Sequence, residues 1–269
     1  MAKDIIIFGK SSVLSKNFVN IIKKENRTIF ITREKKSKND INYDISKKLC
    51  PNELKKIVLE IDDYSENKEK VLILFSWKGR PRSSSLHENT WSVNMNIVIN
   101  FLEISKIIKP QRLIFISSAG AIYPQDKMQS FNELDLTIPT SPYGEQKILG
   151  EALIENFSKS NNIAFTILRV SSAFGLDERY SEQGVINKWI YSAIENKKLN
   201  LYNSEESLIN FISFDNISEA IKISIDKDID GIFNIGSEKS ITLKEILITI
   251  KKVTRNDLHL NVLNNQIRL

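Results

Sequence analysis

The chain has 269 residues, and its composition is that of a globular protein able to bury a sizeable core. Hydrophobic residues make up 41% and charged residues 26%, which argues against global disorder. The net charge of +5 comes from charges spread along the chain without a run of five or six like charges, so a nucleic-acid partner is not indicated.

Cysteine and histidine are scarce in this chain. The single cysteine, Cys50, excludes an internal disulfide and a multi-cysteine metal cluster, and it is typical of a thiol in a reducing compartment. With only His87 and His259, a histidine-based zinc site is not expected, so we predict no metal site. The apolar run Ile5–Gly9 is too short for a signal peptide or a membrane span, and no later stretch reaches 18 apolar residues. We therefore expect a soluble, cytoplasmic protein without a membrane partner.

Apolar, β-branched runs alternate with longer helical patterns through the first two thirds of the chain. Their continuous Ile, Val, Leu and Phe content predicts parallel strands buried on both faces. The predicted strands are Ile5–Phe8, Thr28–Thr32, Val71–Phe75, Leu113–Ser117 and Phe165–Val170. The predicted helices between them are Ser12–Lys24, Asn52–Glu60, Trp91–Ile108 and Tyr143–Ser160. This alternation predicts an α/β fold with a doubly wound parallel sheet.

The pattern changes after about residue 175. Polar stretches at 33–42 and 62–70 are predicted to be loops of the first part. The later part is expected to hold shorter elements: helices Gly184–Asn196, Asp215–Asp226 and Thr242–Thr254, and strands Leu199–Tyr202 and Phe211–Ser213. We predict a dinucleotide-binding domain over residues 1–175 and a small substrate-binding part over 176–269, interleaved with the sheet.

The first strand runs into a glycine turn and then a helix. Free backbone N–H groups and the helix dipole at such a junction favour a pyrophosphate. The spacing G-x-x-G-x-x-G falls on Gly9, Ser12 and Ser15, so two of the three glycines are serine, which adopts a positive φ less freely. The loop predicts a cofactor site that includes Gly9, Ser11, Ser12, Val13 and Leu14, with an ordinary strand–turn–helix as the alternative.

The end of the second predicted strand bears on the choice of cofactor. A fold that prefers NAD usually places an acid there to hold the ribose 2′-hydroxyl. Here Thr32 is followed by Arg33, which would suit the 2′-phosphate of NADP. A solvated surface cation is the alternative interpretation of Arg33.

The strongest chemical pattern is Tyr143 and Lys147, four residues apart at the start of a helix and therefore on one face. A free phenol has a pKa near ~10 and is a poor base at neutral pH. A neighbouring ammonium would lower that pKa, so that Tyr143 exchanges a proton with a sugar hydroxyl while a nicotinamide exchanges a hydride. Two unrelated surface residues of a helix are the alternative.

Taken together, these patterns resemble the extended short-chain dehydrogenase/reductases, the NAD-dependent epimerase/dehydratase family of nucleotide-sugar enzymes. The resemblance runs from Ile5 to about Thr254 and implies a Rossmann fold. Besides the phosphate loop, it rests on the following landmarks: Tyr43-Asp44-Ile45, Val93-Asn94, Ser117-Ser118 with Ile122-Tyr123, Ser141-Pro142-Tyr143 with Lys147, Leu168-Arg169 with Phe174-Gly175, 210–215 (NFISFD) and 231–236 (GIFNIG).

The resemblance implies roles for individual residues. Tyr143 would be the acid/base, and Lys147 would hold the nicotinamide ribose and tune Tyr143. Asn94 would be a buried helix asparagine that bonds backbone near the cofactor. The predicted cofactor site comprises Gly9, Ser11, Ser12, Val13, Leu14, Arg33, Asp44, Ile45, Phe75, Ser76, Asn94, Tyr143 and Lys147.

Several positions depart from the family pattern. Ala119 stands where the family usually has a Ser or Thr, so Ser118 is the candidate to supply the catalytic hydroxyl. Ile209 replaces a common arginine and Trp77 a small residue after the third predicted strand. The predicted substrate-binding residues are Ser118, Ala119, Gly120, Ser172 and Lys188. Arg179 and Lys188 are candidates to neutralise a substrate diphosphate, with solvated surface charges as the alternative.

The resemblance predicts an NAD(P)-dependent enzyme that acts on a nucleoside-diphosphate sugar, with a 4-epimerase as the first hypothesis. An NADPH-dependent 4-ketoreductase is the alternative. Arg33 favours this alternative because its side chain would suit the 2′-phosphate of NADPH. A non-catalytic dinucleotide-binding regulator is the second alternative, motivated by Ala119, Ile209 and the missing glycines. We also expect a homodimer that joins helices 91–108 and 143–160 of two copies in a four-helix bundle.

Overall fold

The computed structural model describes residues 2–22, 26–34, 36–66, 69–79, 88–124, 130–175, 184–201 and 204–262. The chain forms two compact units. The first comprises Met1–Val170 and Asp215–Ile235, and the second comprises Ser171–Phe214 and Gly236–Leu269. The division by packing therefore assigns residues 215–235 to the first unit, whereas the division expected from the sequence lies at residue 175.

A seven-stranded sheet organises the first unit, in the order β11-β6-β5-β4-β1-β2-β3 with every neighbouring pair parallel. Its strands are β1 (Asp4–Phe8), β2 (Arg27–Thr32), β3 (Asp40–Asn42), β4 (Lys70–Leu74), β5 (Arg112–Ser118), β6 (Ala164–Val170) and β11 (Gly231–Ile235). The order reverses direction next to β1, as in a doubly wound sheet. The predicted fold class is confirmed.

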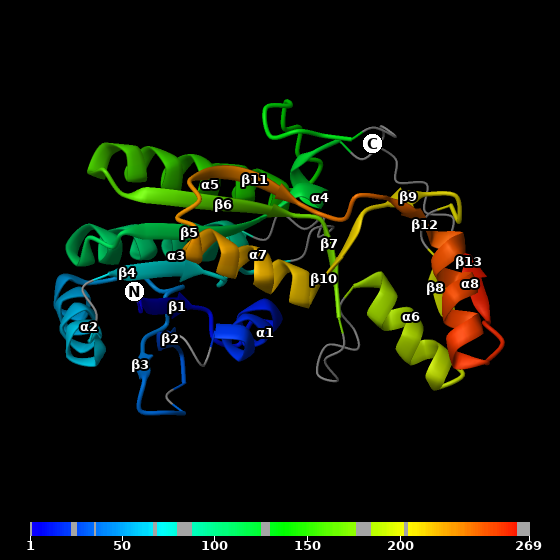
Figure 1. Ribbon diagram of the computed structural model, residues 1–269, viewed down its shortest axis with the longest axis horizontal. Coiled ribbons are helices and arrows are strands. Elements are labelled where there is room, and N and C mark those ends of the chain that lie inside the picture. Colours follow the sequence, from blue (N-terminus) through cyan, green and yellow to red (C-terminus); the bar gives the residue numbers. More distant parts are fainter. Residues whose placement is uncertain are drawn as a thin grey trace. The chain divides into compact units, whose positions relative to one another are not determined.

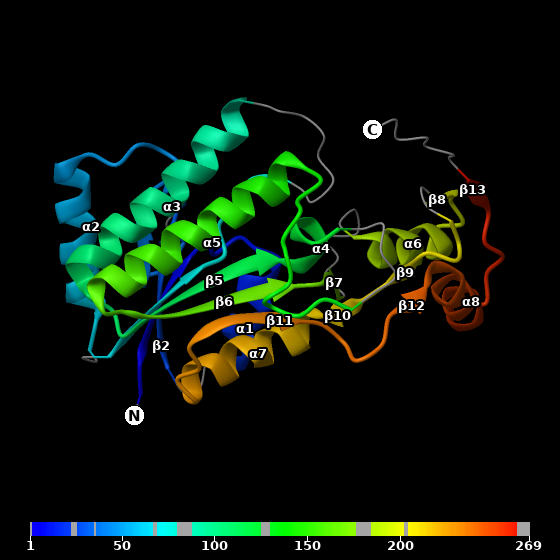
Figure 2. The same cartoon turned by 90° about the horizontal axis from the view of Figure 1, so that it is seen from above.

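Helices cover both faces of this sheet (Figures 1 and 2). The helices α2, α3 and α5 lie on one face, and α1 and α7 lie on the other. Their bounds are α1 (Val13–Ile22), α2 (Pro51–Tyr64), α3 (Glu88–Ile108), α4 (Ala119–Ile122), α5 (Pro142–Asn161) and α7 (Phe214–Asp226). Because each long crossover returns the chain to a parallel strand, the carboxyl ends of β1, β4 and β5 open at one edge.

The central strands are buried on both faces, which explains their unbroken apolar sequences. All five residues of β1 are buried, and Ile5, Ile6 and Ile7 have no exposed surface. Leu72 and Phe115 of the neighbouring strands join the same core, where Phe8 packs edge-on against Phe101 of α3 with ring centroids 5.0 Å apart. The five strands predicted in this part of the chain are confirmed, with ends that differ by about one residue.

Two strands of the sheet, β3 and β11, were not among the strands predicted from the sequence. The stretch 33–42 was predicted to be a loop, but its last residues form the edge strand β3, paired with β2. Ile41 is the only apolar side chain of that strand, so no alternation marks it, yet it is 1% exposed. The other edge strand, β11, is half-buried along its whole length and pairs with β6.

The second unit has a core of its own, built on α6 (Val185–Ile194) and α8 (Leu243–Thr254). Trp189 and Leu247 are among its buried residues. Its short strands form three pairs: β7 (Ser172–Phe174) with β10 (Phe211–Ser213), β8 (Leu199–Leu201) with β13 (Leu260–Val262), and β9 (Leu208–Ile209) with β12 (Ile241–Thr242). Across the described residues of both units, no helix is both long enough and apolar enough to cross a bilayer.

Candidate active site

The turn after β1 is formed by a glycine that no other residue could replace without strain. Gly9 has a φ of 106°, and a Cβ on it would lie 2.6 Å from the backbone N of Ser76. That close approach is fixed because Phe75 N and Ser76 N both donate to Phe8 O at 2.9 Å. The backbones after β1 and β4 therefore lie in contact at the carboxyl edge of the sheet, where a pyrophosphate cradle is expected.

The residues after Gly9 lead directly into α1. Ser12 N donates to Gly9 O at 3.1 Å, and Lys16 N donates to Ser12 O at 3.1 Å. Ser11 is exposed, Ser12 and Leu14 are half-buried, and Val13 begins the helix. The backbone N–H groups of a first helical turn point outward for an anion, so the loop fits the diphosphate of a dinucleotide.

Lys10, which follows Gly9, forms an ion pair with Asp40, the first residue of β3. Lys10 Nζ bonds both carboxylate oxygens of the buried Asp40, at 2.6 and 2.7 Å, and lies 4.6 Å from the centre of the Phe30 ring. Burial would raise the pKa of Asp40, but donation from Lys10, Ser37 and the backbone of Lys36 outweighs it and keeps the pKa low. Arg33, which follows the last residue of β2, is exposed.

Further along the same edge, Asp44 and Ile45 follow β3. Asp44 Oδ1 accepts from Ser46 N at 3.1 Å and from Ser46 Oγ at 2.7 Å, while the Ile45 side chain is 5% exposed. Asp44 keeps part of its surface accessible. Its place in the predicted cofactor site stays a prediction.

Asn94 of α3 holds the segment that follows β4. It is fully buried, accepts from Lys78 N at 2.8 Å and donates to Lys78 O at 2.9 Å. Its amide also donates to Gln146 Oε1 of α5 at 2.6 Å. Asn94 thus joins two helices to the backbone beside Trp77, and no apolar residue of its size could make these three bonds.

Tyr143 lies in the first turn of α5, whose start is defined by its capping residues. Ser141 is the N-cap and accepts from Gly144 N at 3.2 Å, and Pro142 occupies the first turn. Gly144 allows α4 to approach, since a Cβ there would overlap Ala121 O. This contact brings α4, which directly follows Ser118 at the end of β5, to the first turn of α5.

The ammonium of Lys147 is almost fully enclosed. The residue is 4% exposed, and Nζ donates to Ile116 O of β5 at 2.8 Å. Nζ also lies 4.0 Å from the centre of the Trp77 ring and 4.7 Å from that of Phe115. Burial lowers the pKa of Lys147 to about 7, although the carboxylate of Glu151 opposes the shift.

The sequence predicted that Lys147 lowers the pKa of Tyr143, but the structure indicates a raised pKa. Burial raises the pKa of the Tyr143 phenol above its ordinary value. Nζ lies 5.7 Å from the centre of the Tyr143 ring and makes its hydrogen bond to Ile116 O instead. The expectation of a lowered pKa is therefore wrong for the chain by itself, because desolvation outweighs an ammonium that is directed elsewhere.

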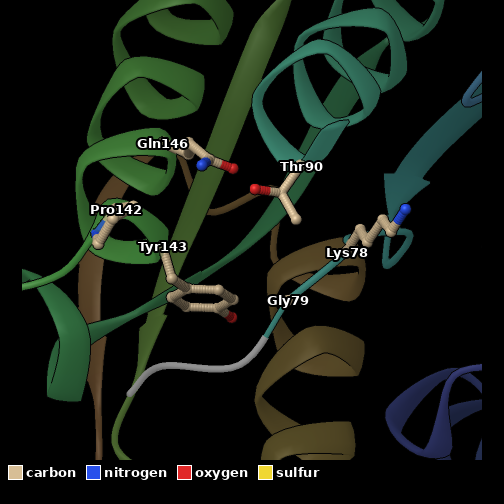
Figure 3. A pocket seen from close by; sticks show the side chains of 6 residues that line it. All are labelled: Lys78, Gly79, Thr90, Pro142, Tyr143 and Gln146. Atoms are coloured by element: carbon tan, nitrogen blue, oxygen red, sulfur yellow. The ribbon is translucent and has the colours of Figure 1, made fainter. Parts of the chain in front are cut away.

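Tyr143 borders a shallow hollow (Figure 3). Its ring extends from α5 across the hollow, and the Lys78 side chain points away from it. The hollow is lined by Lys78, Gly79, Thr90, Pro142, Tyr143 and Gln146. Tyr143 as a whole is half-buried where it lines this hollow.

The sequence did not point to a buried ion pair next to this site. Glu151 and Arg169 bond at 2.8 Å with side chains 5% and 7% exposed, and Ser117 Oγ donates to Glu151. Arg169 Nη1 donates to Tyr123 Oη at 2.8 Å, which links β6 to the end of α4. Glu151 lies one helical turn beyond Lys147, so the spacing Tyr-x-x-x-Lys-x-x-x-Glu was its only signal.

A comparison with protein families decides the assignment. The model of the NAD dependent epimerase/dehydratase family matches residues 5–236. The chain belongs to this family. The resemblance to this family predicted from the sequence is thereby confirmed, and the match covers both the Gly9 loop and the Tyr143–Lys147 pair.

Individual relatives share limited sequence identity with this chain, over about half of its length. An Escherichia coli dTDP-4-dehydro-6-deoxyglucose reductase is 31% identical over 143 residues, which cover 52% of this chain and 45% of that protein. A dTDP-D-glucose 4,6-dehydratase from Dictyostelium discoideum is 29% identical, covering 52% of this chain and 35% of that protein. The chain spans about half the length of the first curated relatives that it matches.

Solved structures share the fold of this chain at low sequence identity. The UDP-N-acetylglucosamine 4-epimerase of Methanobrevibacter ruminantium, in complex with UDP-N-acetylmuramic acid, has a TM-score of 0.84 and 21% identity, covering 99% of this chain and 86% of that chain. The UDP-glucuronic acid 4-epimerase of Bacillus cereus, in complex with UDP-glucuronic acid and NAD, has a TM-score of 0.82 and 21% identity, covering 97% and 86%.

The first unit contains every predicted catalytic residue and every predicted cofactor-binding residue. Ser118 ends β5 and is half-buried, and Ala119 and Gly120 begin α4. The other predicted substrate residues belong to the second unit: Ser172 begins β7 and Lys188 is exposed on α6. Arg179 lies outside the described residues. Sequence reasoning missed Trp77 as a neighbour of Lys147.

Proposed function

We propose that the chain is a nicotinamide-dependent nucleoside-diphosphate-sugar 4-epimerase that uses Tyr143 as its acid/base. The observation that carries this proposal is the enclosed Lys147 one turn from a half-buried Tyr143 that lines a hollow, at the carboxyl edge where the Gly9 turn meets Ser76. Epimerases among the solved structures with this fold support the choice of reaction.

The residues present fit a dinucleotide. Gly9 allows the backbones after β1 and β4 to meet where a Cβ would overlap Ser76 N, α1 begins four residues later, and Asp44 retains accessible surface beside Ile45. When bound, the nicotinamide would supply the hydride acceptor and donor. Gly9 would contact the diphosphate, and Lys147 would hold the ribose hydroxyls.

Tyr143 would handle the proton at the sugar. Burial favours the protonated phenol in the chain alone, so the oxidising half requires that the bound cofactor lower the pKa of Tyr143. As a phenolate, Tyr143 Oη would then take the proton of the C4 hydroxyl, and in the reducing half it would return that proton to the C4 carbonyl oxygen. Ser118 Oγ would donate to the same oxygen, in place of the hydroxyl missing at Ala119. The Asn94 bonds to Lys78 would keep the backbone beside Tyr143 fixed.

A second candidate is an NADPH-dependent 4-ketoreductase. Burial keeps Tyr143 protonated, and a protonated phenol is the form that donates to a ketone. The exposed Arg33 at the end of β2 would suit a 2′-phosphate, and an E. coli reductase is among the relatives. This candidate uses the same Tyr143 and Lys147 but consumes its cofactor in each turnover.

One set of assays separates the candidates. The purified protein is incubated with UDP-glucose, UDP-N-acetylglucosamine or UDP-glucuronate, and the sugar protons are followed by NMR. An epimerase forms the 4-epimer without added cofactor, whereas the reductase oxidises NADPH only with a 4-keto sugar nucleotide. Tyr143→Phe is expected to lower turnover by about 10² to 10⁴-fold, and Tyr64→Phe at the end of α2 is the matched control. Unchanged turnover in Tyr143→Phe would favour a binding role and contradict the proposal.

The choice between NAD and NADP is tested separately. We propose NADP as the preferred cofactor on account of Arg33, and expect Arg33→Met to weaken NADPH binding about tenfold while NADH binding changes little. Fluorescence titration of both nucleotides measures the ratio. Protein that retains NAD through desalting would contradict the preference for NADP.

We further propose a homodimer in which α3 and α5 of two copies form a four-helix bundle. The two helices lie side by side on one face of the sheet (Figure 2), and they expose Ile99, Ile107 and Leu149, which are 50%, 49% and 39% exposed. Light scattering is expected to give twice the chain mass, and Ile99→Lys to give a monomer. A monomeric wild type would contradict the proposed dimer.

We also propose that the protein is cytoplasmic, since its exposed Cys50 is a free thiol, as is usual in a reducing compartment.

A further inference from the structure

Three aromatic rings surround the ammonium of Lys147, and one of them is unexpected. Trp77 follows β4, and the centre of its ring lies 4.0 Å from Nζ, closer than Phe115 at 4.7 Å or Tyr143 at 5.7 Å. Trp77 and Phe115 also contact each other, with centroids 5.6 Å apart. The indole face is therefore the nearest of the three π surfaces to the charge.

The helix that carries Lys147 is shaped to admit this indole. Gly150 lies three residues further along α5, on the same face, and a Cβ there would be 3.3 Å from Trp77 Cη2 and 3.2 Å from Phe115 Cζ. A glycine within a helix is unfavourable relative to alanine, so its presence calls for a packing reason. Trp77 Nε1 is buried and makes no hydrogen bond to the described residues, which leaves ring packing to hold the indole.

We propose that Trp77 is a positioning residue for Lys147, whose indole face holds the ammonium against Ile116 O and beside the Tyr143 ring. The inference rests on the proposed function for its catalytic meaning, since it assigns Trp77 to the same site. Among the described residues, Trp77 takes the place that water would take around an exposed lysine. An aliphatic side chain of similar bulk would exclude water but would offer the charge nothing.

The other ionisable groups near Lys147 do not replace this contact. Tyr143 and Glu151 lie on the same helix, and the Glu151 carboxylate is engaged by Arg169 of β6 and by Ser117 of β5. Lys78 follows Trp77 and is exposed on the far side of the Tyr143 hollow. Burial lowers the pKa of Lys147 to about 7, so the amine titrates where a change in its surroundings can be measured.

The experiment measures the charge of Lys147 directly. Protein labelled with ¹³C at lysine Cε is titrated by NMR, and the Lys147 resonance is assigned by its loss in Lys147→Arg. Fluorinated tryptophan withdraws electron density from the indole face without changing its shape. We expect it to lower the midpoint of the Lys147 titration by about 0.4 to 1.5 pH units. In a Trp77→Phe background, where fluorotryptophan replaces only Trp91 and Trp189, the same labelling should move nothing.

Substitutions give a second, independent series. Trp77→Leu is expected to lower the midpoint by a similar amount, Trp77→Phe to fall between it and wild type, and Trp91→Leu on α3 to leave it unchanged. A midpoint unaffected by fluorination would overturn the proposal, as would a Trp77→Phe midpoint as low as that of Trp77→Leu. If Trp77→Leu does not fold, the fluorinated protein decides alone.

This titration needs neither substrate nor cofactor, so it stands apart from the proposed function. If turnover on a nucleotide sugar is found, the alkaline limb of its pH profile should move down in the same order of variants. If Tyr143→Phe leaves turnover unchanged, the proposed function fails while the titration still decides whether Trp77 holds the ammonium.

Discussion

Two ion pairs at the carboxyl edge of the same sheet are built in different ways. At the Tyr143 end, Glu151 and Arg169 are both buried, with side chains 5% and 7% exposed. At the Gly9 end, Asp40 is fully buried, but the side chain of its partner Lys10 is 30% exposed. A charge that loses its partner at the first site stays buried, whereas solvent can reach the vacated position at the second. Removing one partner of the ion pair should therefore lower the free energy of unfolding more at the Tyr143 end than at the Gly9 end.

The sharpest test of this difference is Glu151→Gln. The substitution keeps the shape of the side chain but leaves the Arg169 guanidinium buried without a counter-charge, so we expect a loss of about 3 to 5 kcal/mol in the free energy of unfolding. Urea denaturation measures it. The matched control on the same helix is Glu155→Gln, whose partner Lys159 is 65% exposed, and which should cost less than about 0.5 kcal/mol. Equal losses in the two variants would contradict the comparison.

The Gly9 end has one position that is as intolerant as the Tyr143 end. Gly9→Ala places a methyl group 2.6 Å from Ser76 N at a φ of 106°, and we expect a loss of about 2 to 4 kcal/mol from strain and overlap. Gly120→Ala is the control, because nothing lies within 4 Å of its added Cβ. Thermal unfolding should separate the two variants clearly; an intact Gly9→Ala would mean that β1 and β4 can part at this point.

These two sites also show how far the sequence predicts the molecule. The strand Ile5–Phe8 is apolar at every position, so its burial and its place in the sheet follow from the sequence alone. The edge strand β3 has a single apolar residue, Ile41, and was predicted to be a loop, because only its pairing with β2 defines it.

The site divides in the same way. The spacing of Tyr143 and Lys147 on one helix was visible because α5 is local in sequence. The position of Trp77 over Lys147 joins segments from β4 and α5 and depends on the missing Cβ of Gly150. Likewise the raised pKa of Tyr143 follows from burial, which no spacing reveals. The sequence therefore predicts the residues of the site that lie on one helix, but not the contacts between segments that are distant in the sequence.

Lys147 makes the Tyr143 end sensitive to pH. Its pKa is about 7 in the folded chain and lies near ~10.4 in an unfolded one, so between these values the unfolded state binds more protons. Stability should therefore rise with pH over this window, by about 1 kcal/mol per pH unit from this group. The slope should be absent in Lys147→Met and retained in Lys159→Met, whose side chain is exposed. Urea denaturation at several pH values gives the difference; equal slopes in wild type and Lys147→Met would contradict the enclosed amine.

The smallest effect is expected at the Lys10–Asp40 pair. In Lys10→Met the Asp40 carboxylate keeps its bonds from Lys36 N, Ser37 N and Ser37 Oγ, so we expect a loss of only about 1 kcal/mol. Asp40 has a lowered pKa in the fold, so its share of stability is present above its unfolded pKa and is lost as the pH falls through the folded value. Removing Lys10 raises that folded pKa, so the variant should lose stability at a higher pH than wild type. Acid unfolding followed by circular dichroism measures the shift, and because Lys10 is 30% exposed, added salt should weaken the difference between the two proteins.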